Sequence, residues 1–383
     1  MPLPFFRVLP FVFGLFALLA CPSSATAEMR GAWVASVHNL NFPSRAGLSA
    51  GAQQAEIRRI VELAASCNLN SLMVQVRPEG DALYRSRLEP WSRFLTGTQG
   101  SDPGYDPLAT FIAEGRARGI AIHAWINPYR AATGKGGRAD NHITRTLPNS
   151  VRRVGSMLWM DPGDPAVRQH VVRVVEDIVR RYAVGGVILD DYFYPYPGTG
   201  LPRGTFPDDN TYGRYQAGGG NLQRADWRRE NVNTLIRELH TVVHANRKGA
   251  WFGVSPFGIY RPNVPRGVEA QLDQLTELYS DPMAWLREGS VDYLSPQLYW
   301  ADAGPQSYSS LLGWWRSGST NPRGILIFPS LAVDRLGGSH NWPVSEISNQ
   351  LRIEKSIRPA GGFILWSIGP LLQNKKGVNG VLR

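Results

Sequence analysis

Cysteine is almost missing from this chain of 383 residues, which contains only Cys21 and Cys67. Cys21 belongs to an N-terminal signal, where it is either lipidated or removed, so the mature chain can form no internal disulfide. Cys67 ends the helical pattern "AEIRRIVELAASC", and we expect it to be a small buried apolar residue. Stability must therefore come from a hydrophobic core, for which 43% hydrophobic residues are sufficient.

Long apolar runs are missing too. The run from Val8 to Ala20 follows the single charge Arg7 and is too short to cross a bilayer, which is typical of an export signal. We expect residues 1–27 to be a signal peptide, cleaved either before Cys21, in the lipobox-like "LLAC", or after Ala27. We favour lipidation of Cys21 because this motif directly follows the apolar run. The sequence thus predicts a lipoprotein of the periplasm and cell envelope. Proline follows Cys21 in place of the aspartate that commonly signals retention in the inner membrane, so we favour the outer membrane, although the sequence does not name it directly.

Acidic residues are fewer than basic ones, 31 against 41, which gives a net charge of +10. Exported basic proteins meet anionic envelope polymers, and neither export nor any motif favours nucleic acid as a partner. The 12 tryptophans and 14 tyrosines are typical of sugar-binding clefts as well as of large cores. We expect a monomer that binds glycan and needs no cofactor.

Eight short apolar runs alternate with helical patterns, and no linker or change in composition divides them. Asp164 and Pro165 mark the start of one helix, as N-cap and first helical residue. The alternation predicts a (β/α)8 TIM barrel that forms a single domain over residues 28–383. A doubly wound open sheet is the alternative, but "VASVHNLNFPS" is not the Gly-rich phosphate loop that it needs after its first strand. The runs are 31–37, 71–76, 121–128, 186–195, 251–256, 293–300, 325–333 and 361–369.

Polar and aromatic residues gather at the carboxyl ends of these predicted strands, where TIM barrels carry their active sites. Asp292 precedes the sixth strand instead, and we expect it at the opposite rim with a structural role. Ser255 and Ser367 end the fifth and eighth strands. The candidate substrate-binding residues are Arg77, Trp125, Asn127, Tyr129, Tyr192, Tyr194, Gln297, Tyr299, Trp300 and Trp366.

Two adjacent aspartates end the fourth strand in "GVILDDYFYP". Because neighbouring strand residues point to opposite faces, only one of Asp190 and Asp191 is expected in the barrel lumen, while the other faces the helices or bends into the next loop. The spacing "G-x-x-x-D" resembles barrel glycosidases and assigns the lumen to Asp190. The alternative is that both aspartates merely cap the following segment.

Glycoside hydrolysis needs two carboxyl groups, of which one is ionised and the other protonated. A second carboxyl group is therefore required beside the lumen aspartate. Glu79 and Asp81 follow the second strand in "RPEGDALY" and project from the same rim. Asp226, Asp334 and Asp191 itself are further candidates. No spacing decides among them, so retention or inversion of configuration stays open.

A rival motif is "HTVVH", in which His240 and His244 have the spacing of a metal-binding pair in polysaccharide deacetylases. Leu235, Leu239 and Val243 belong to the apolar stripe of that helix, and the histidines lie on its polar side. We therefore predict surface histidines and no metal. A second region of interest is the long stretch 196–225, where Tyr196, Tyr212 and Tyr215 are candidates for lining a cleft, although a solvated loop would look the same.

The motifs "RGAWVASVHNLNFPS", "QVRPEGDALY", "HAWINPYR", "DPGDPAVR", "GVILDDYFYP", "GVSPFGIYR" and "YLSPQLYW" resemble the glycosyl-hydrolase-like family of bacterial envelope proteins. That family includes the divisome-localised glycosyl hydrolase. The resemblance covers about residues 30–370. It implies a (β/α)8 glycosidase, often a lipoprotein, that acts in cell division on peptidoglycan strands stripped of their peptides, with catalysis by Asp190 and Asp191. A non-catalytic glycan-binding barrel and, less favoured, a metal-dependent deacetylase are the alternatives.

Overall fold

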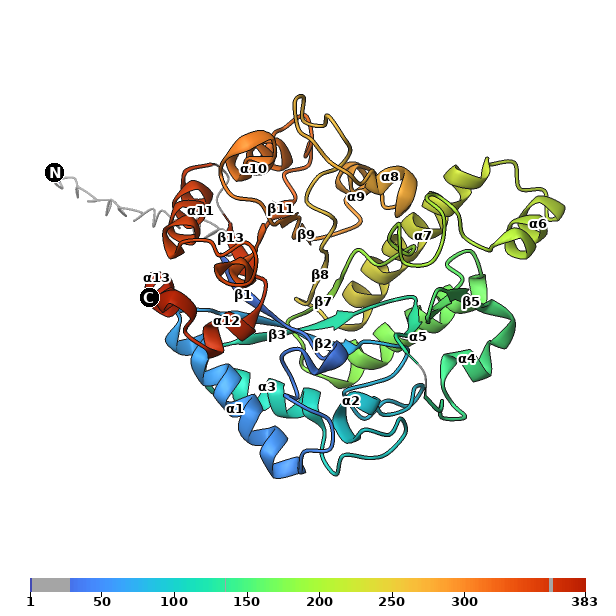
Figure 1. The fold of residues 1–383 in the computed structure, drawn as a ribbon, viewed down its shortest axis with the longest axis horizontal. Helices are drawn as coiled ribbons and strands as arrows, with labels where there is room; N and C mark the ends of the chain where they lie inside the picture. Colours follow the sequence, from blue (N-terminus) through green and yellow to red (C-terminus); the bar gives the residue numbers. More distant parts are fainter. Residues whose placement is uncertain (2–27, 135, 358–360) are drawn as a thin grey trace.

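The computed structural model describes residues 1, 28–134, 136–357 and 361–383, which form a closed β/α barrel (Figure 1). Ten strands occupy eight positions, because Pro296 and Pro329 each divide one position into two short strands. The order around the barrel is the order of the chain, as predicted. The strands are β1 (Met29–Val34), β2 (Ser71–Arg77), β3 (Ala121–Ile126), β7 (Gly186–Leu189), β8 (Trp251–Val254), β9 (Tyr293–Leu294) with β10 (Gln297–Leu298), β11 (Leu326–Ile327) with β12 (Ser330–Leu331), and β13 (Gly362–Leu365).

The barrel is closed because its last strand pairs with its first. Gly362 lies opposite Met29 in the parallel register of β13 and β1. Across the divided strands, the amide of Phe328 donates to the carbonyl of Leu294 at 2.9 Å and the amide of Trp366 to that of Leu331 at 2.8 Å. A closed sheet excludes the open, doubly wound alternative.

Helices surround the barrel, and four of them match the helical patterns of the sequence: α1 (Ala50–Ser66), α3 (Pro107–Ala117), α5 (Pro165–Arg181) and α7 (Arg224–Asn246). Asp164 caps α5 as predicted, since its Oδ1 accepts a hydrogen bond from the amide of Ala166 at 3.0 Å. The remaining helices are α2 (Arg93–Thr96), α4 (Ile143–Thr146), α6 (Asp209–Ala217), α8 (Gln274–Glu277), α9 (Pro282–Glu288), α10 (Tyr308–Arg316), α11 (Val344–Ser356), α12 (Ile368–Leu372) and α13 (Val378–Leu382).

Strand alternation divides the core into two parts. Val187 and Leu189 face the helices and join the large outer cluster, which also contains Cys67. Ile188 faces the lumen and packs in an inner cluster with Trp33 and Trp125. The lumen is therefore filled by side chains, as in other small closed barrels.

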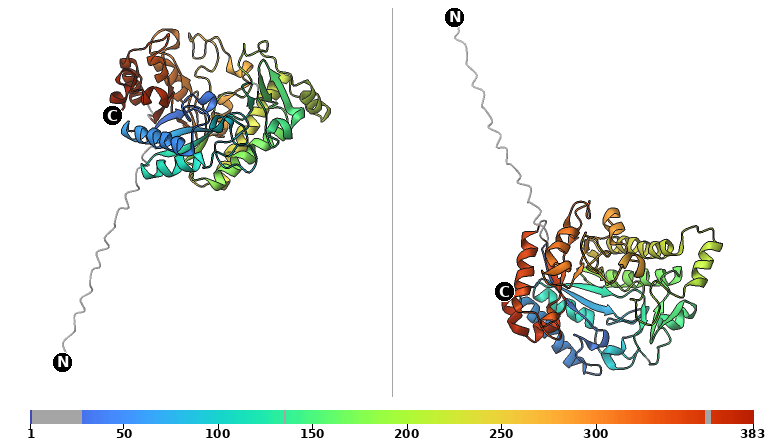
Figure 2. Two further views of the ribbon diagram at one scale, coloured as in Figure 1. Left: turned by 60° about the horizontal axis from the view of Figure 1, so that its bottom comes forward. Right: turned by 45° about the horizontal axis from the view of Figure 1, so that its top comes forward.

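Two features of the fold were missed by the sequence patterns. A three-stranded antiparallel sheet, β4 (Arg130–Ala132), β6 (Met157–Met160) and β5 (Val151–Val154), follows the third barrel strand, and α6 lies inside the predicted loop 196–225. Both views in Figure 2 place this sheet and α6 at the end of the molecule away from the C-terminus. The strands are only three or four residues long, too short for a clear periodicity.

The predicted signal peptide and the lipidation site Cys21 lie outside the described residues. Within the described ranges, no helix has the length and apolar character that a membrane span requires. Cys67 is buried and unpaired there, as expected.

Candidate active site

The carboxylate of Asp190 is held by two side chains of the neighbouring strand. The register of β3 and β7 places Trp125 opposite Ile188, so two residues further along Asn127 comes beside Asp190. The indole Nε1 of Trp125 donates to Oδ2 of Asp190 at 3.0 Å, and Nδ2 of Asn127 donates to both carboxylate oxygens at 3.1 Å. These three hydrogen bonds from two donor groups stabilise the ionised form of the buried carboxylate.

Asp191 lines the same cavity, although the alternation of the strand had assigned the two carboxylates to different sides. The expectation of a single lumen carboxylate is wrong because β7 ends at Leu189, so the pair lies beyond the last residue to which alternation applies. The hydroxyl of Tyr196 donates a hydrogen bond to Oδ2 of Asp191. The pair therefore forms one acidic centre at the carboxyl end of the fourth barrel strand.

The cavity around the pair encloses about 180 Å³ and has mostly aromatic walls. Trp33 and Trp125 meet edge to face, with ring centroids 4.9 Å apart, and Trp366 lies 6.0 Å from Trp125. Aromatic rings with a few convergent polar groups are typical of ligand sites, and their faces suit sugar rings. The lining residues are Trp33, Trp125, Asp190, Asp191, Tyr192, Tyr196, Ser255, Gln297, Tyr299 and Trp366.

Burial raises the pKa of both carboxyl groups, but their surroundings differ. At Asp190, the charge of Arg130 and the donors Trp125 and Asn127 oppose this rise. At Asp191, burial acts together with the negative charge of Asp190, against the hydrogen bond from Tyr196, and raises the pKa to about 7. Two adjacent carboxyl groups with unlike environments are suited to share acid and anion roles.

Glu79 and Asp81, the other sequence-based candidates for catalysis, do not line the cavity. Arg93 pairs with Glu79 at 3.0 Å and the amide of Thr133 donates to it at 2.7 Å. Burial opposes ionisation of Glu79, yet Arg93 and Thr133 outweigh it and lower the pKa. Asp81 is fully buried, and burial together with the charge of Glu79 raises its pKa to about 7.

The two remaining acidic candidates also lie outside the cavity lining. Asp226 is exposed and pairs with Arg229 on the surface of α7. Asp334 follows the seventh barrel strand, and its backbone amide donates to the carbonyl of Trp366 at 3.1 Å. Of the candidate carboxylates, only Asp190 and Asp191 therefore line the cavity.

Arg77 does not line the cavity but contacts the main chain next to it. Its guanidinium is fully buried and forms a bidentate pair with Glu89, at 2.6 Å for the closest contact. Its NH1 also donates to the carbonyl oxygens of Asn127 and Pro128, at 2.6 and 3.1 Å. Arg77 thus fixes the main chain that carries the Asn127 side chain to Asp190, which is a positioning role.

Several aromatic candidates are part of the packing around the site. Tyr129 and Tyr194 are almost completely buried, and Trp300 packs edge to face on Phe257 with centroids 5.6 Å apart. Tyr212 and Tyr215 lie against Trp227 of α7. The residues among the candidates that line the cavity are Trp125, Asp190, Asp191, Tyr192, Gln297, Tyr299 and Trp366, with Tyr196 from the long stretch and Ser255 from the fifth strand.

Sequence reasoning overlooked Trp33 and Arg130. Trp33 lies in the first strand among apolar residues. There, a cavity residue differs from a core residue only in which face of the strand it occupies, and the sequence does not show which face points into the lumen. Arg130 is close behind Asn127 in "HAWINPYR", and its guanidinium lies over the ring of Tyr192 at 5.1 Å. Nothing in the sequence placed its charge near Asp190.

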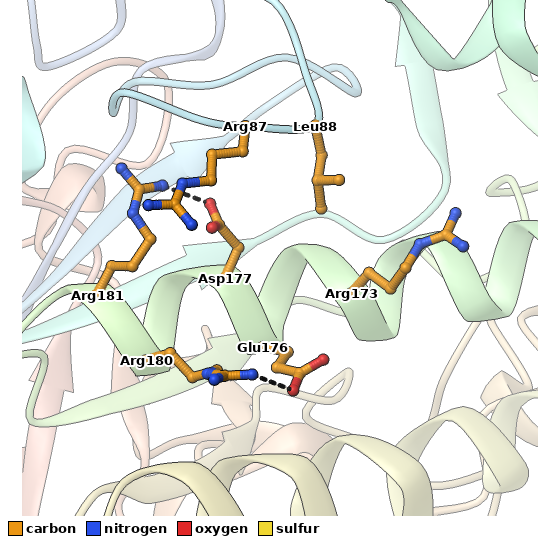
Figure 3. Close-up of a pocket in the computed structure, with 7 residues that line it drawn as sticks. All are labelled: Arg87, Leu88, Arg173, Glu176, Asp177, Arg180 and Arg181. Atoms are coloured by element: carbon orange, nitrogen blue, oxygen red, sulfur yellow. Dashed lines mark hydrogen bonds and ion pairs between the residues drawn. The ribbon is translucent and has the colours of Figure 1, made fainter.

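A second, arginine-rich groove lies on the outer surface of α5 (Figure 3). Arg181 pairs with Asp177 at 2.7 Å and Arg180 with Glu176 at 3.3 Å, both four residues apart on the helix. Such pairs are typical of a solvated helix surface, and the lining contains no aromatic side chain. We therefore place the candidate active site at the Asp190–Asp191 cavity.

The metal-dependent alternative does not fit this cavity, because no histidine is among its lining residues. In the described part of the chain, the group of side chains able to converge on a metal ion is His240, His244 and Asp292. Asp292 immediately precedes β9, at the rim opposite to Asp190, as the sequence predicted. The aspartate pair and the histidine pair therefore do not form a common deacetylase centre.

Comparison with known proteins finds glycosyl hydrolases among the relatives of this chain. The model of the family "Glycosyl hydrolase-like 10" matches residues 28–342. The chain is 34% identical to "Glycosyl hydrolase YngK" of Bacillus subtilis, over 96% of this chain and 74% of that one, and 32% identical to "Glycosyl hydrolase DigH" of Escherichia coli K12, over 91% and 84%.

Solved structures of glycosidases share the fold. The PgaB (BpsB) glycoside hydrolase domain of Bordetella bronchiseptica superposes with a TM-score of 0.61 at 13% identity, covering 93% of this chain and 98% of that domain. The endo-1,4-beta-mannanase of Rhizomucor miehei superposes with a TM-score of 0.53 at 8% identity, covering 93% and 95%. At these identities the likeness concerns the barrel fold.

Proposed function

The chain belongs to the glycosyl hydrolase-like 10 family, and we propose that it hydrolyses glycan strands of bacterial peptidoglycan from which the peptides have been removed. The observation that carries this proposal is the Asp190–Asp191 pair in an aromatic cavity at the carboxyl end of a barrel strand. The family resemblance supports the choice of glycan.

The composition of the cavity favours a glycan. Its lining consists of the two aspartates and otherwise aromatic or neutral polar residues. Aromatic faces of this kind stack on sugar rings. The choice of a strand without peptides rests on the family resemblance.

We assign the proton-donating role to Asp191. Its pKa of about 7 keeps a large fraction protonated near neutral pH, which a general acid requires. Asp190 serves as the anion, because Trp125 and Asn127 donate to it and Arg130 lies nearby. The two donors come from the end of the third barrel strand and are fixed beside Asp190, so the anion is preorganised.

The nucleophile is then the substrate itself. Asp190 and Asp191 are adjacent in the chain, whereas a protein nucleophile attacks C1 from the face opposite to the leaving oxygen that the acid protonates. In this proposal the 2-acetamido oxygen attacks C1 while the bond to the leaving oxygen breaks, and that oxygen takes the proton of Asp191. Asp190 accepts a hydrogen bond from the acetamido N–H as positive charge develops. Water then attacks C1 and gives a proton to Asp191, while the bond between C1 and the acetamido oxygen breaks and restores the acetamido group. The two displacements give net retention of configuration.

For the cellular location, we propose a lipoprotein of the cell envelope, anchored through Cys21 and active during cell division. The signal-like segment 1–27 and the family resemblance support this proposal. Cys21→Ser should move the protein from the membrane fraction to the soluble periplasm. A wild-type protein that is already soluble, with Glu28 as its first residue, would contradict lipidation.

The test of the proposed reaction uses purified protein and two substrates, sacculi treated with an amidase and untreated sacculi. We expect soluble, peptide-free oligosaccharides from the treated sacculi only, with no loss of turnover in EDTA. Binding without release would instead indicate a non-catalytic glycan-binding barrel. Release of acetate that is lost in EDTA and restored by zinc would indicate a deacetylase.

A further inference from the structure

Although the sequence predicted surface histidines without a metal, we propose that His240, His244 and Asp292 bind a divalent transition metal, with zinc as the best match. This site lies on the face of the barrel opposite to the candidate active site. The two histidines are one turn apart on α7, and their ring centroids are 4.5 Å apart. Asp292 comes from the segment before β9. One ligand atom from each residue lies within 4.8 Å of the others.

The distances fit a metal ion without rearrangement of the backbone. Nε2 of His244 is 3.0 Å from Oδ2 of Asp292, and Nε2 of His240 is 3.6 Å from Oδ1. Ligands of a tetrahedral zinc ion lie about 2.0–2.2 Å from the metal and hence about 3.3 Å from one another. The three side chains already point toward a common centre, so binding requires only small side-chain rotations.

The carboxylate of Asp292 accepts a hydrogen bond from the main chain, and metal-ligating carboxylates are usually oriented by such a bond. The amide of Phe252 donates to its Oδ2 at 2.6 Å. This bond joins the cluster to the start of strand β8, so the ion would connect α7 with the amino-terminal end of the barrel. His244 is also within hydrogen-bond distance of Asp292, and saturable zinc binding distinguishes a metal site from this hydrogen bond alone.

The donor set selects the class of metal. Two imidazole nitrogens and one carboxylate oxygen suit Zn²⁺, Ni²⁺ or Cu²⁺, whereas Ca²⁺ and Mg²⁺ prefer oxygen donors alone. The side chains of His240, His244 and Asp292 retain 29, 40 and 24% of their exposure, so ions can enter and the fourth position faces water.

This site is structural and independent of the proposed hydrolysis. Asp292 precedes β9, whereas Asp190 follows β7, so the two sites lie at opposite ends of parallel strands. Removal of the metal should therefore leave glycan cleavage unchanged, while it should lower the melting temperature. Failure of the metal site and failure of the hydrolase proposal can thus be distinguished.

The experiment is a titration of untagged, EDTA-treated mature protein with ZnCl₂, followed by calorimetry and thermal melting, with Co²⁺ absorption as a probe of tetrahedral geometry. We expect one ion per chain and a higher melting temperature. His244→Ala should weaken binding at least about tenfold, and Asp292→Asn likewise, although the asparagine carbonyl can still accept from Phe252. His38→Ala, which removes another exposed histidine, is the matched control.

Two results would overturn the proposal. One is the absence of saturable zinc binding to the wild-type protein. The other is binding that His244→Ala and Asp292→Asn leave as strong as in the His38→Ala control. Circular dichroism of each variant confirms that it is folded, and because His244 is exposed, its replacement should be tolerated.

Discussion

The indole nitrogen of Trp125 lies 3.0 Å from the carboxylate of Asp190, and this bond joins the third barrel strand to the fourth at the candidate active site. Trp125→Phe removes the donor but keeps an aromatic ring against Trp33. We expect glycan cleavage to fall by about 10- to 100-fold, since one of the donors that stabilise the anion is lost. Rate measurements at saturating substrate test this expectation.

The matched control is Trp300→Phe, which makes the same change outside the cavity lining. It should keep the wild-type rate. Equal losses of cleavage rate in the two variants would show that Trp125 acts through packing. Its hydrogen bond to Asp190 would then make no contribution to catalysis.

The pH profile of the reaction should report the acid role of Asp191. Because burial and the charge of Asp190 raise the pKa of this group to about 7, cleavage should decline as pH rises through about 7 and the proton is lost. Asp81→Asn is the control, since Asp81 has a similarly raised pKa outside the cavity lining. The decline should persist in Asp81→Asn. If it disappeared in that variant, the proton lost near pH 7 would belong to Asp81 and not to Asp191.

The same pKa shift has a consequence for stability. A carboxyl group whose pKa is raised from 3.8 to about 7 on folding holds its proton more tightly in the native state. Its stabilising contribution is complete below about pH 4 and is lost as pH rises to about 7. Asp191→Asn should therefore flatten the fall in melting temperature between these pH values. An unchanged slope would mean that the folded and unfolded pKa values of Asp191 do not differ.

The buried pair of Arg77 and Glu89 should matter more to stability than any surface pair. Burial opposes ionisation of Glu89, but Arg77 and His170 outweigh it and lower its pKa to about 2. Glu89→Gln leaves the Arg77 charge unpaired, which should cost about 3–5 kcal/mol in the free energy of unfolding. Cleavage should also fall, because Arg77 fixes the main chain at Asn127. Urea denaturation tests the first effect.

Glu176→Gln is the comparison for this variant, because it removes a partner of Arg180 from an exposed pair on α5 (Figure 3). Its effect on the free energy of unfolding should stay within about 0.5 kcal/mol. Similar costs in both variants would contradict the assignment of a structural role to the buried pair.

Participation of the acetamido group can be tested on the substrate. Chemical de-N-acetylation of the stripped glycan should abolish cleavage, and a thiazoline analogue of the cyclic intermediate should inhibit competitively. NMR of the first product should show the β anomer. Cleavage of de-N-acetylated glycan at the original rate, or formation of the α anomer, would require a protein nucleophile or a direct attack by water.

Much of the fold could be predicted, because buried parallel strands such as 186–189 give continuous apolar runs and helices such as α5 carry clear caps. The sheet β4–β6–β5 could not, since its strands are too short to show a period. At the site, the end of a strand predicted Asp190 and Asp191, but not that both line one cavity. Whether both side chains line the cavity depends on where β7 ends. The strand ends at Leu189, and the sequence at Leu189 and Asp190 carries no signal of that end.

Glu79 shows a second limit of prediction. A carboxylate after a barrel strand predicts catalysis, yet Arg93 and Thr133, 14 and 54 residues away, fold onto it and make it an ion-paired structural residue. The convergence of Asp292 with His240 and His244 is likewise a long-range contact, across 48 residues from His244. Contacts at such separations leave no local pattern.

The most direct test of the account is the rate of reducing-end release from amidase-stripped glycan by the wild-type protein, Asp190→Asn and Asp191→Asn, with thermal melting of each. The account predicts that the cleavage rate of Asp190→Asn falls by about a thousandfold or more. Its melting temperature should be unchanged or slightly higher, because the isosteric change removes a buried charge. Asp191→Asn should also lose cleavage, together with the limb near pH 7. Cleavage by Asp190→Asn at close to the wild-type rate would contradict the central claim that this carboxylate serves catalysis.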